Sequence, residues 1–221
     1  MEQNKIKAAT PTAHQLGKLS EHYESGGRGP GAVSGGQGDP GGVSYGLYQL
    51  ASKTGTAADF VKTEGAPWAK ELAGIPGSAV FSAAWQAIAA RDGERFAKAQ
   101  QDFIARSHYR PVVQAVLAAT QHDLDARPDA VRDACWSAAV QHGAAARLLI
   151  GAVGDADALA LRGQIDHDRA TITAAYKRRS AYVRAIADKS RGAVRQTLMN
   201  VVEKRYPSEL SAALAMLALL R

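Results

Sequence analysis

Cysteine is nearly absent from this 221-residue sequence, in which Cys135 is the single example. One thiol excludes a disulfide within the chain and a metal cluster held by several cysteines. Long apolar runs are also missing. The longest, from Leu210 to Leu220, is shorter than the roughly 18 residues that a membrane-spanning helix needs. We therefore expect a chain without a transmembrane segment.

A secretory leader is also missing from the start of the sequence. Residues 1–19 contain lysines but no apolar core followed by a small-residue cleavage site. We expect residues 1–11 to be a flexible segment and the protein to be made in the cytoplasm without a signal peptide. If it acts in the periplasm or cell wall, phage holin release or a secretion system must deliver it.

The composition is that of a globular protein. Hydrophobic residues make up 46% of the chain and charged residues 22%, which excludes wholesale disorder, and the length favours one domain over 1–221. The net charge is +6, and residues 171–205 hold nine Lys/Arg against Asp188 and Glu203. This basic patch favours an anionic partner: nucleic acid, lipid or cell-wall polymer. A solvated helix face is the alternative.

Three kinds of pattern divide the sequence. Residues 12–24 have helical spacing, residues 25–46 are rich in glycine, and residues 43–50 alternate as a strand or small hairpin does. Beyond residue 54 the pattern is helical, with apolar stripes over 80–88 and 96–104. Pro111, Pro128 and Pro207 indicate three helix starts. We expect a mainly α fold with a small glycine-rich β-hairpin lobe near the N-terminus.

Two carboxylates flank the glycine-rich segment. Glu24 lies at the predicted end of the first helix, and Asp39 lies within the loop between Gly38 and Pro40. Partial burial would keep Glu24 protonated, while backbone N–H groups around Asp39 would favour its ionised form. Glycosidic hydrolysis uses such a pair, one acid and one ionised carboxylate. Alternatively, Glu24 is a solvated helix end and Asp39 a turn residue.

The string YESGG…GPG…GDPGGVSYGLYQL resembles the lysozyme-like superfamily. It is similar to muralytic domains of phage endolysins and tail proteins, and to C-terminal domains fused to VgrG spikes of type VI secretion systems. Lytic transglycosylases, goose-type lysozymes and chitosanases have a related arrangement. The resemblance is specific over residues 22–52 and weaker over 99–112 and 136–143. It implies an α+β lysozyme-like fold with a cleft between the two lobes.

The resemblance also implies site residues. Glu24 corresponds to the general acid, and Asp39 to the acid that positions water in the chitosanase-like and phage-like members. Substrate-binding positions would include six further residues: Ser25, Tyr45, Tyr48, Gln49, Gln141 and His142. A helix-end or packing role is the alternative for Gln141 and His142. Tyr48 stands where the transglycosylases have methionine, and the loop is longer here. A carboxylate in the loop can act as a base for water, so Asp39 favours hydrolysis over intramolecular formation of an anhydro-sugar.

The sequence therefore predicts a peptidoglycan glycoside hydrolase that cleaves β-1,4 bonds, with glycan strands as its partner. An immunity protein or a holin is a further expected partner. The alternatives are a lytic transglycosylase, a chitosanase, or a non-catalytic basic module that binds cell wall or nucleic acid. We expect no cofactor, nucleotide or metal, because the histidines lack the HExxH spacing. Asp166-His167-Asp168 fits a solvated helix face better than a metal site, and Cys135 fits core packing.

Overall fold

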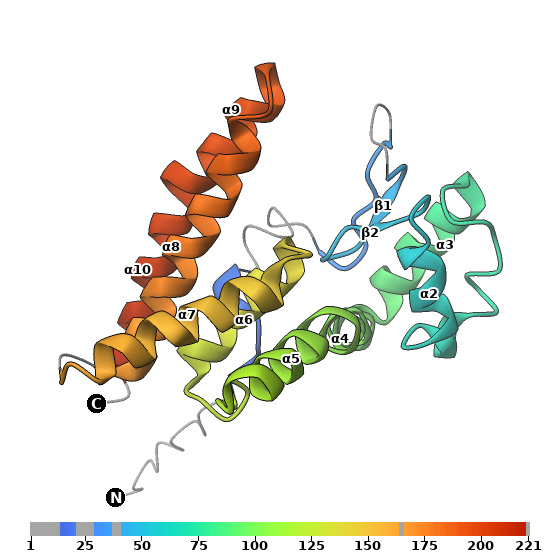
Figure 1. Cartoon of the computed structure of the whole chain (residues 1–221). Helices are drawn as coiled ribbons and strands as arrows, with labels where there is room; N and C mark the ends of the chain where they lie inside the picture. The colour runs from blue at the N-terminus through green and yellow to red at the C-terminus, as the bar shows by residue number, and fades with distance from the viewer. Residues whose placement is uncertain (1–13, 21–28, 37–40, 164–165, 220–221) are drawn as a thin grey trace, which may run out of the picture.

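The computed structural model describes residues 14–20, 29–36, 41–163 and 166–219. Over these ranges the chain is mainly helical, with one small two-stranded antiparallel sheet (Figure 1). The predicted mainly α fold with a small β-containing part is confirmed at this level. A cleft between two lobes stays a prediction. Of the helix predicted over 12–24, only residues 18–20 are helical within the described ranges.

The small sheet is a hairpin. Strand β1 (Ser44–Tyr45) pairs with β2 (Leu50–Ala51) in antiparallel register. The chain reverses between them because Gly46 (φ 72°) and Gln49 (φ 53°) adopt left-handed conformations. The alternation over residues 43–50 therefore comes from two short strands and their turn, and a single strand through the whole segment is excluded.

Three short helices pack around this hairpin: α2 (Thr56–Lys62), the 3-10 turn Ala66–Trp68 and α3 (Ala79–Arg91). Aromatic rings fill the space between them. The Trp85 ring centroid lies 5.2 Å from that of Tyr45, 5.3 Å from that of Phe60 and 4.7 Å from that of Phe96. In the predicted apolar stripe of α3, Phe81, Trp85 and Ile88 are buried, Ala84 is half-buried, and Val80 is 70% exposed.

Two long helices pass through a wider π turn without breaking. In the first, α4 (Gly93–Ile104) continues through Ala105–Tyr109 into α5 (Arg110–Thr120). In the second, α9 (Gly192–Asn200) continues through Val201–Arg205 into α10 (Tyr206–Ala218). Pro111 and Pro207 are each the second residue after a π turn. A proline donates no backbone N–H and clashes with the preceding turn, and the wider turn accommodates both effects. Two of the three predicted helix starts are therefore continuations.

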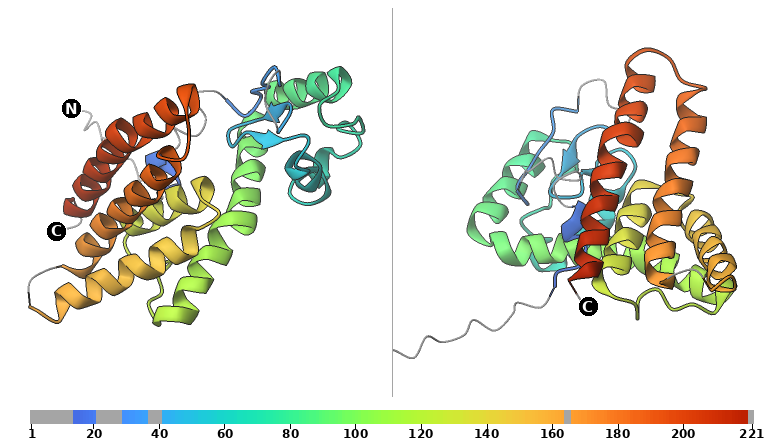
Figure 2. Two further views of the ribbon diagram at one scale, coloured as in Figure 1. Left: turned by 45° about the horizontal axis from the view of Figure 1, so that its top comes forward. Right: turned by 90° about the vertical axis from the view of Figure 1, so that its left-hand side faces the viewer.

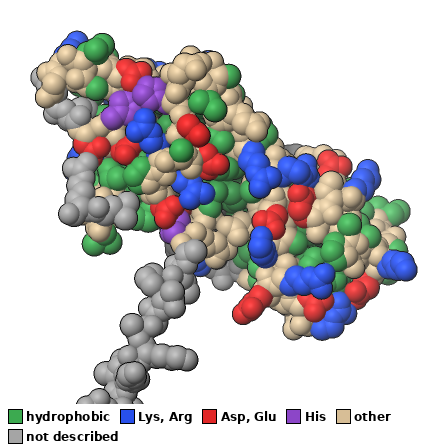
Figure 3. Space-filling view, turned by 90° about the horizontal axis from the view of Figure 1, so that it is seen from below, with side chains coloured by type: hydrophobic (Ala, Val, Ile, Leu, Met, Phe, Trp, Pro, Cys, Tyr) green, Lys and Arg blue, Asp and Glu red, His purple; other side chains and the backbone are tan. Residues whose placement is uncertain are grey.

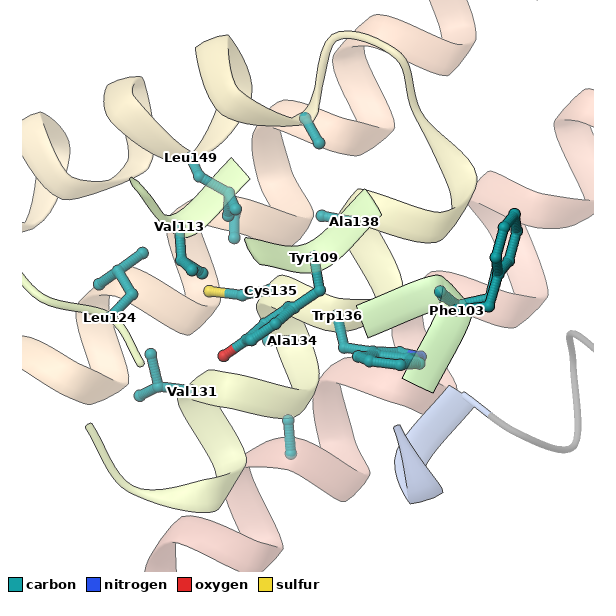
Figure 4. Close-up of a cluster of buried hydrophobic side chains, with 14 of the residues drawn as sticks. Phe103, Tyr109, Val113, Leu124, Val131, Ala134, Cys135, Trp136, Ala138 and Leu149 are labelled. Atoms are coloured by element: carbon teal, nitrogen blue, oxygen red, sulfur yellow. The ribbon is translucent and has the colours of Figure 1, made fainter. Parts of the chain in front are cut away.

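The remaining helices form the larger part of the molecule. Helix α6 (Asp129–Gln141) begins after Pro128, as predicted, and is buried along most of its length. Helix α8 (His167–Ala187) packs against α7 (Ala145–Ala160), α6 and α10. Figure 2 shows α8 and α10 side by side. Figure 4 shows the Cys135 thiol among apolar side chains of α5, α6 and α7. Cys135 is 1% exposed, which confirms its packing role.

In the described part of the chain, no helix combines the length and apolarity that crossing a bilayer requires.

Candidate functional site

The two predicted catalytic carboxylates, Glu24 and Asp39, lie outside the described residues, and so does Ser25. The other five predicted site residues are described and fall into two groups. Tyr45, Tyr48 and Gln49 belong to the hairpin. Gln141 and His142 lie at the end of α6.

The hairpin residues stabilise the turn. Tyr45 is completely buried, and its hydroxyl accepts a hydrogen bond from Gly77 N (2.9 Å) and contacts Ser82 Oγ (2.9 Å). Gln49 Nε2 donates to the Gly46 carbonyl (3.0 Å). In this structure Tyr45 is thus a core residue, and the Gln49 amide is bonded within its own turn.

A buried glutamine ties the hairpin to α4. Gln100 is fully buried; its Oε1 accepts from Leu47 N (2.9 Å), and its Nε2 donates to the Pro30 carbonyl (3.0 Å). Gln100 therefore fixes the turn and the preceding loop through one side chain.

Tyr48, in the same turn, packs edge-on against Trp136 of α6, with ring centroids 5.9 Å apart.

Gln141 and His142 belong to a buried polar network between α6, α8 and α10. Gln141 Oε1 accepts hydrogen bonds from Arg179 Nη2 (2.7 Å) and the Tyr206 hydroxyl (2.8 Å). His142 Nε2 lies 2.7 Å from the same hydroxyl. Because the Tyr206 proton is donated to Gln141, His142 donates from Nε2 to the Tyr206 oxygen.

The centre of this network is an ion pair in the core. Arg179 and Glu209 are at most 1% exposed, and Arg179 Nη1 lies 3.6 Å from Glu209 Oε2. The guanidinium carbon lies 4.8 Å and 4.5 Å from the ring centroids of Tyr176 and Tyr206. Ser137 Oγ accepts from Arg179 Nη2 and donates to Glu209 Oε2 (2.9 and 2.7 Å). The Ser137 hydroxyl thus bridges the two buried charges.

His142 is neutral at pH 7. Burial, with repulsion from the Arg179 and Arg205 cations, lowers the pKa of His142 to about 4. Gln141 and His142 also line a cavity of about 240 Å³, whose opposite wall comes from Tyr182, Ile186 and apolar residues of α9 and its π turn. The structure therefore brings these two predicted residues together at a small, largely apolar cavity.

The basic patch predicted over 171–205 divides into paired and exposed side chains. Arg179 is buried with Glu209, Arg205 Nε binds Glu209 Oε1 (2.5 Å), and Arg178 Nε binds Asp155 Oδ2 (2.7 Å). The other six basic side chains are exposed and form what we call the basic face: Lys177, Arg184, Lys189, Arg191, Arg195 and Lys204.

Two cavities include members of the basic face in their lining. One, of about 510 Å³ between α7 and α8, is lined by Arg162, Arg169 and Lys177 among others. The other, of about 540 Å³, includes Lys204 and Arg205 in its lining, with Ser208 from α10. Both cavities therefore offer cationic groups to an anionic ligand.

Comparison with known proteins places this helical architecture in a family. Residues 16–209 match the family described as "Type VI secretion system spike protein VgrG3-like, C-terminal", and the chain belongs to that family. A curated relative is the type VI secretion system spike protein VgrG3 of Vibrio cholerae serotype O1. It is 37% identical over 139 residues, which make up 62% of this chain and 13% of that protein. The chain thus spans a small part of the relative's length.

This match corrects the identification made from the motifs. The type VI secretion element of that interpretation is confirmed. The identification as a lysozyme-like peptidoglycan hydrolase is not, because the matched family and relative are described as spike proteins and neither description names a hydrolase. The family match therefore overturns the predictions of an enzyme and of a glycoside-hydrolase function.

Sequence reasoning missed the buried ion pair and a second polar cluster. The sequence analysis counted Arg179 among the charges of the basic patch. Ala174, Ala175 and Val183, one helical turn before and after it, predict instead that Arg179 lies on a buried helix face. His122, Asp157 and His167 meet in space although they are 35 and 10 residues apart in sequence. No local spacing could have indicated that cluster.

Proposed function

We propose that this chain is a binding module of a type VI secretion spike, and that its basic face holds the peptidoglycan of a target cell. Membership of the VgrG3-like C-terminal family supports its place on a spike and delivery by that secretion system. The observation that carries the binding role is the basic face, which leaves six cationic side chains in solvent on α8, α9 and their neighbours.

The chemistry of the ligand suits this surface. Peptidoglycan carries many carboxylates on its stem peptides, so a repeated anionic lattice would meet several cations at once. Each exposed ion pair contributes only about 0.2–1 kcal/mol, and salt screens it over about 10 Å. Binding therefore requires several contacts together, and the basic face has six exposed Lys and Arg side chains to make them. The cleft predicted between the two lobes would give a glycan strand a further place to lie.

Co-sedimentation with purified peptidoglycan sacculi tests this function. The variant Lys189→Glu/Arg191→Glu/Arg195→Glu reverses three charges of the basic face. The matched control, Lys53→Glu/Lys62→Glu/Lys70→Glu, reverses three exposed charges near α2. We expect the first variant to bind about tenfold more weakly or worse, because three exposed pairs together contribute roughly 1.4 kcal/mol. The control variant is expected to bind nearly as the original chain does.

Three results would contradict the proposal. Equal binding by both variants would exclude the basic face as the binding surface. Retention on DNA with no retention on sacculi would indicate a nucleic-acid module instead. Release of soluble sugar products from the sacculi would show that the chain does more than bind.

A further inference from the structure

Three metal-ligating side chains from three segments meet at the surface of the larger helical part. His122 lies in the loop between α5 and α6, Asp157 lies near the end of α7, and His167 is the first residue of α8. Asp157 Oδ1 is 3.1 Å from His122 Nε2 and 2.8 Å from His167 Nε2. One ligand atom of each residue lies within 4.8 Å of the others.

These distances are close to those of a metal site. With ligands about 2.0–2.1 Å from Zn²⁺ in a tetrahedron, neighbouring ligand atoms are roughly 3.3 Å apart. The two observed nitrogen–oxygen distances, 3.1 and 2.8 Å, would open by only a few tenths of an ångström. The imidazole rings are stacked, with centroids 4.7 Å apart and planes at 8°, so both rings present the same edge to the carboxylate.

The hydrogen bonds of His167 are compatible with a metal at Nε2. Thr171 Oγ1 donates to the His167 carbonyl (2.9 Å), so toward His167 Nδ1, 3.5 Å away, the hydroxyl can only accept. Without a metal, a hydrogen on His167 Nε2 is donated to Asp157 Oδ1, 2.8 Å away. A metal ion at the cluster would replace that hydrogen, which would move to Nδ1, where the Thr171 hydroxyl can accept it.

The surroundings allow an ion to reach the cluster. The side chains of His122, Asp157 and His167 are 26%, 44% and 20% exposed, so each is partly sheltered and none is sealed from solvent. The view from below shows histidine side chains at the surface beside Asp and Glu side chains (Figure 3). Water would complete the coordination shell on the exposed side.

One neighbour opposes metal binding. Arg127 Nη2 lies 3.1 Å from His122 Nδ1, and Arg127 Nη1 lies 3.4 Å from Asp168 Oδ1. By donating to Nδ1, Arg127 keeps the hydrogen of a neutral His122 on Nε2, where the metal would bind. Metal binding therefore requires that hydrogen to move to Nδ1 and Arg127 to turn fully toward Asp168. Arg127 thus lowers the affinity of the cluster for a cation.

We propose that His122, Asp157 and His167 form a binding site for a first-row divalent metal, with Zn²⁺ as the best fit. Two imidazole nitrogens and one carboxylate oxygen suit Zn²⁺, whereas Mg²⁺ and Ca²⁺ prefer sites made entirely of oxygen. The ion would join the α5–α6 loop, α7 and the start of α8, and would keep at least one position for water. This site shares no residue with the basic face and does not depend on the function of that face.

Titration of the whole chain with Zn²⁺, followed by competition with a chromophoric chelator, tests the site. We expect one Zn²⁺ per chain and a loss of affinity of about 100-fold or more for Asp157→Asn and for His167→Gln, because changes outside the ligand set already cost 10–100-fold. Arg127→Gln is expected to bind Zn²⁺ more tightly. Co²⁺ substituted for Zn²⁺ is expected to give the intense visible absorption of tetrahedral coordination, absent from both ligand variants.

The matched control is His14→Gln. His14 Nε2 lies 3.1 Å from Asp133 Oδ1, and among the described residues no second histidine joins this pair. This variant is expected to keep the affinity of the original chain within about twofold. Circular dichroism without metal identifies any variant that fails to fold. If a ligand variant fails to fold, the Zn²⁺ affinity of Arg127→Gln decides: tighter binding supports the site, and unchanged binding contradicts it. No saturable Zn²⁺ binding, or equal binding by Asp157→Asn and the original chain, would overturn the proposal.

Discussion

Removal of Glu209 is predicted to destabilise the chain more than any loss of an exposed ion pair. The Glu209 carboxylate accepts hydrogen bonds from Ser137 and Tyr176 and faces Arg179, which is completely buried. Without Glu209, the Arg179 charge stays in the core with no anion beside it. Breaking a buried pair in this way costs about 3–5 kcal/mol. That is a large fraction of the roughly 5–15 kcal/mol that stabilises a domain.

The perturbation is Glu209→Leu, measured by urea unfolding at pH 7 with circular dichroism. We expect the free energy of unfolding to fall by about 3–5 kcal/mol. Adding Arg179→Met removes the stranded charge, so the double variant is expected to lose clearly less than the sum of the two single variants. Asp155→Ala is the control, because it breaks an Arg178 pair whose side chains are 40% and 43% exposed. That change is expected to cost at most about 1 kcal/mol.

The reasoning would be refuted by a Glu209→Leu variant that loses no more stability than Asp155→Ala. It would also be refuted by strict additivity of Glu209→Leu and Arg179→Met, since a coupled pair cannot be additive.

Three further predictions concern the hairpin, the cavity and the thiol. Gly46→Ala should lower the free energy of unfolding by about 2 kcal/mol more than Gly55→Ala. Both glycines have positive φ, but of the two only Gly46 would place a Cβ against a neighbour, the Gln100 Oε1 atom. Equal losses in urea unfolding would contradict the predicted clash. The pKa of His142 is about 4 in the folded chain and about 6.5 when unfolded, so protons favour the unfolded chain between these values. The free energy of unfolding should therefore fall as the pH is lowered from 6.5 to 4, and His142→Gln should flatten that slope. An unchanged slope would exclude His142 as its source. Burial raises the pKa of Cys135 to about 12, so its thiol should react with an alkylating probe only after unfolding; fast labelling of the native chain would show that the thiol is accessible.

Much of the fold could be predicted from periodicity. The stripes over 80–88 and 96–104 identified helices whose inner faces are buried, because burial depends mainly on the local 3.6-residue repeat. Val80 lies at the edge of its stripe and is exposed, because the 3.6-residue repeat predicts which side of a helix is buried but not how wide the buried face is. Pro111 and Pro207 predicted helix starts, but a π turn lets each helix continue, and no sequence signal marks that turn.

The candidate sites could be predicted only in part. The charge count located the basic patch. It could not predict that Arg179 is buried beside Glu209, because the two residues are 30 positions apart in sequence. The resemblance brought Gln141 and His142 into consideration, and they do line one cavity. Tyr45 was expected at a substrate groove and is a core residue here, because aromatic side chains that bind sugars and those that fill cores have the same sequence pattern.

The dissociation constant of the chain on peptidoglycan sacculi, measured against salt concentration, tests the binding proposal most directly. If the basic face makes the contact, affinity falls steadily as salt rises, and the Lys189→Glu/Arg191→Glu/Arg195→Glu variant shows weak binding with little salt dependence. A salt-insensitive affinity that is the same for both proteins would contradict an electrostatic contact through α8 and α9.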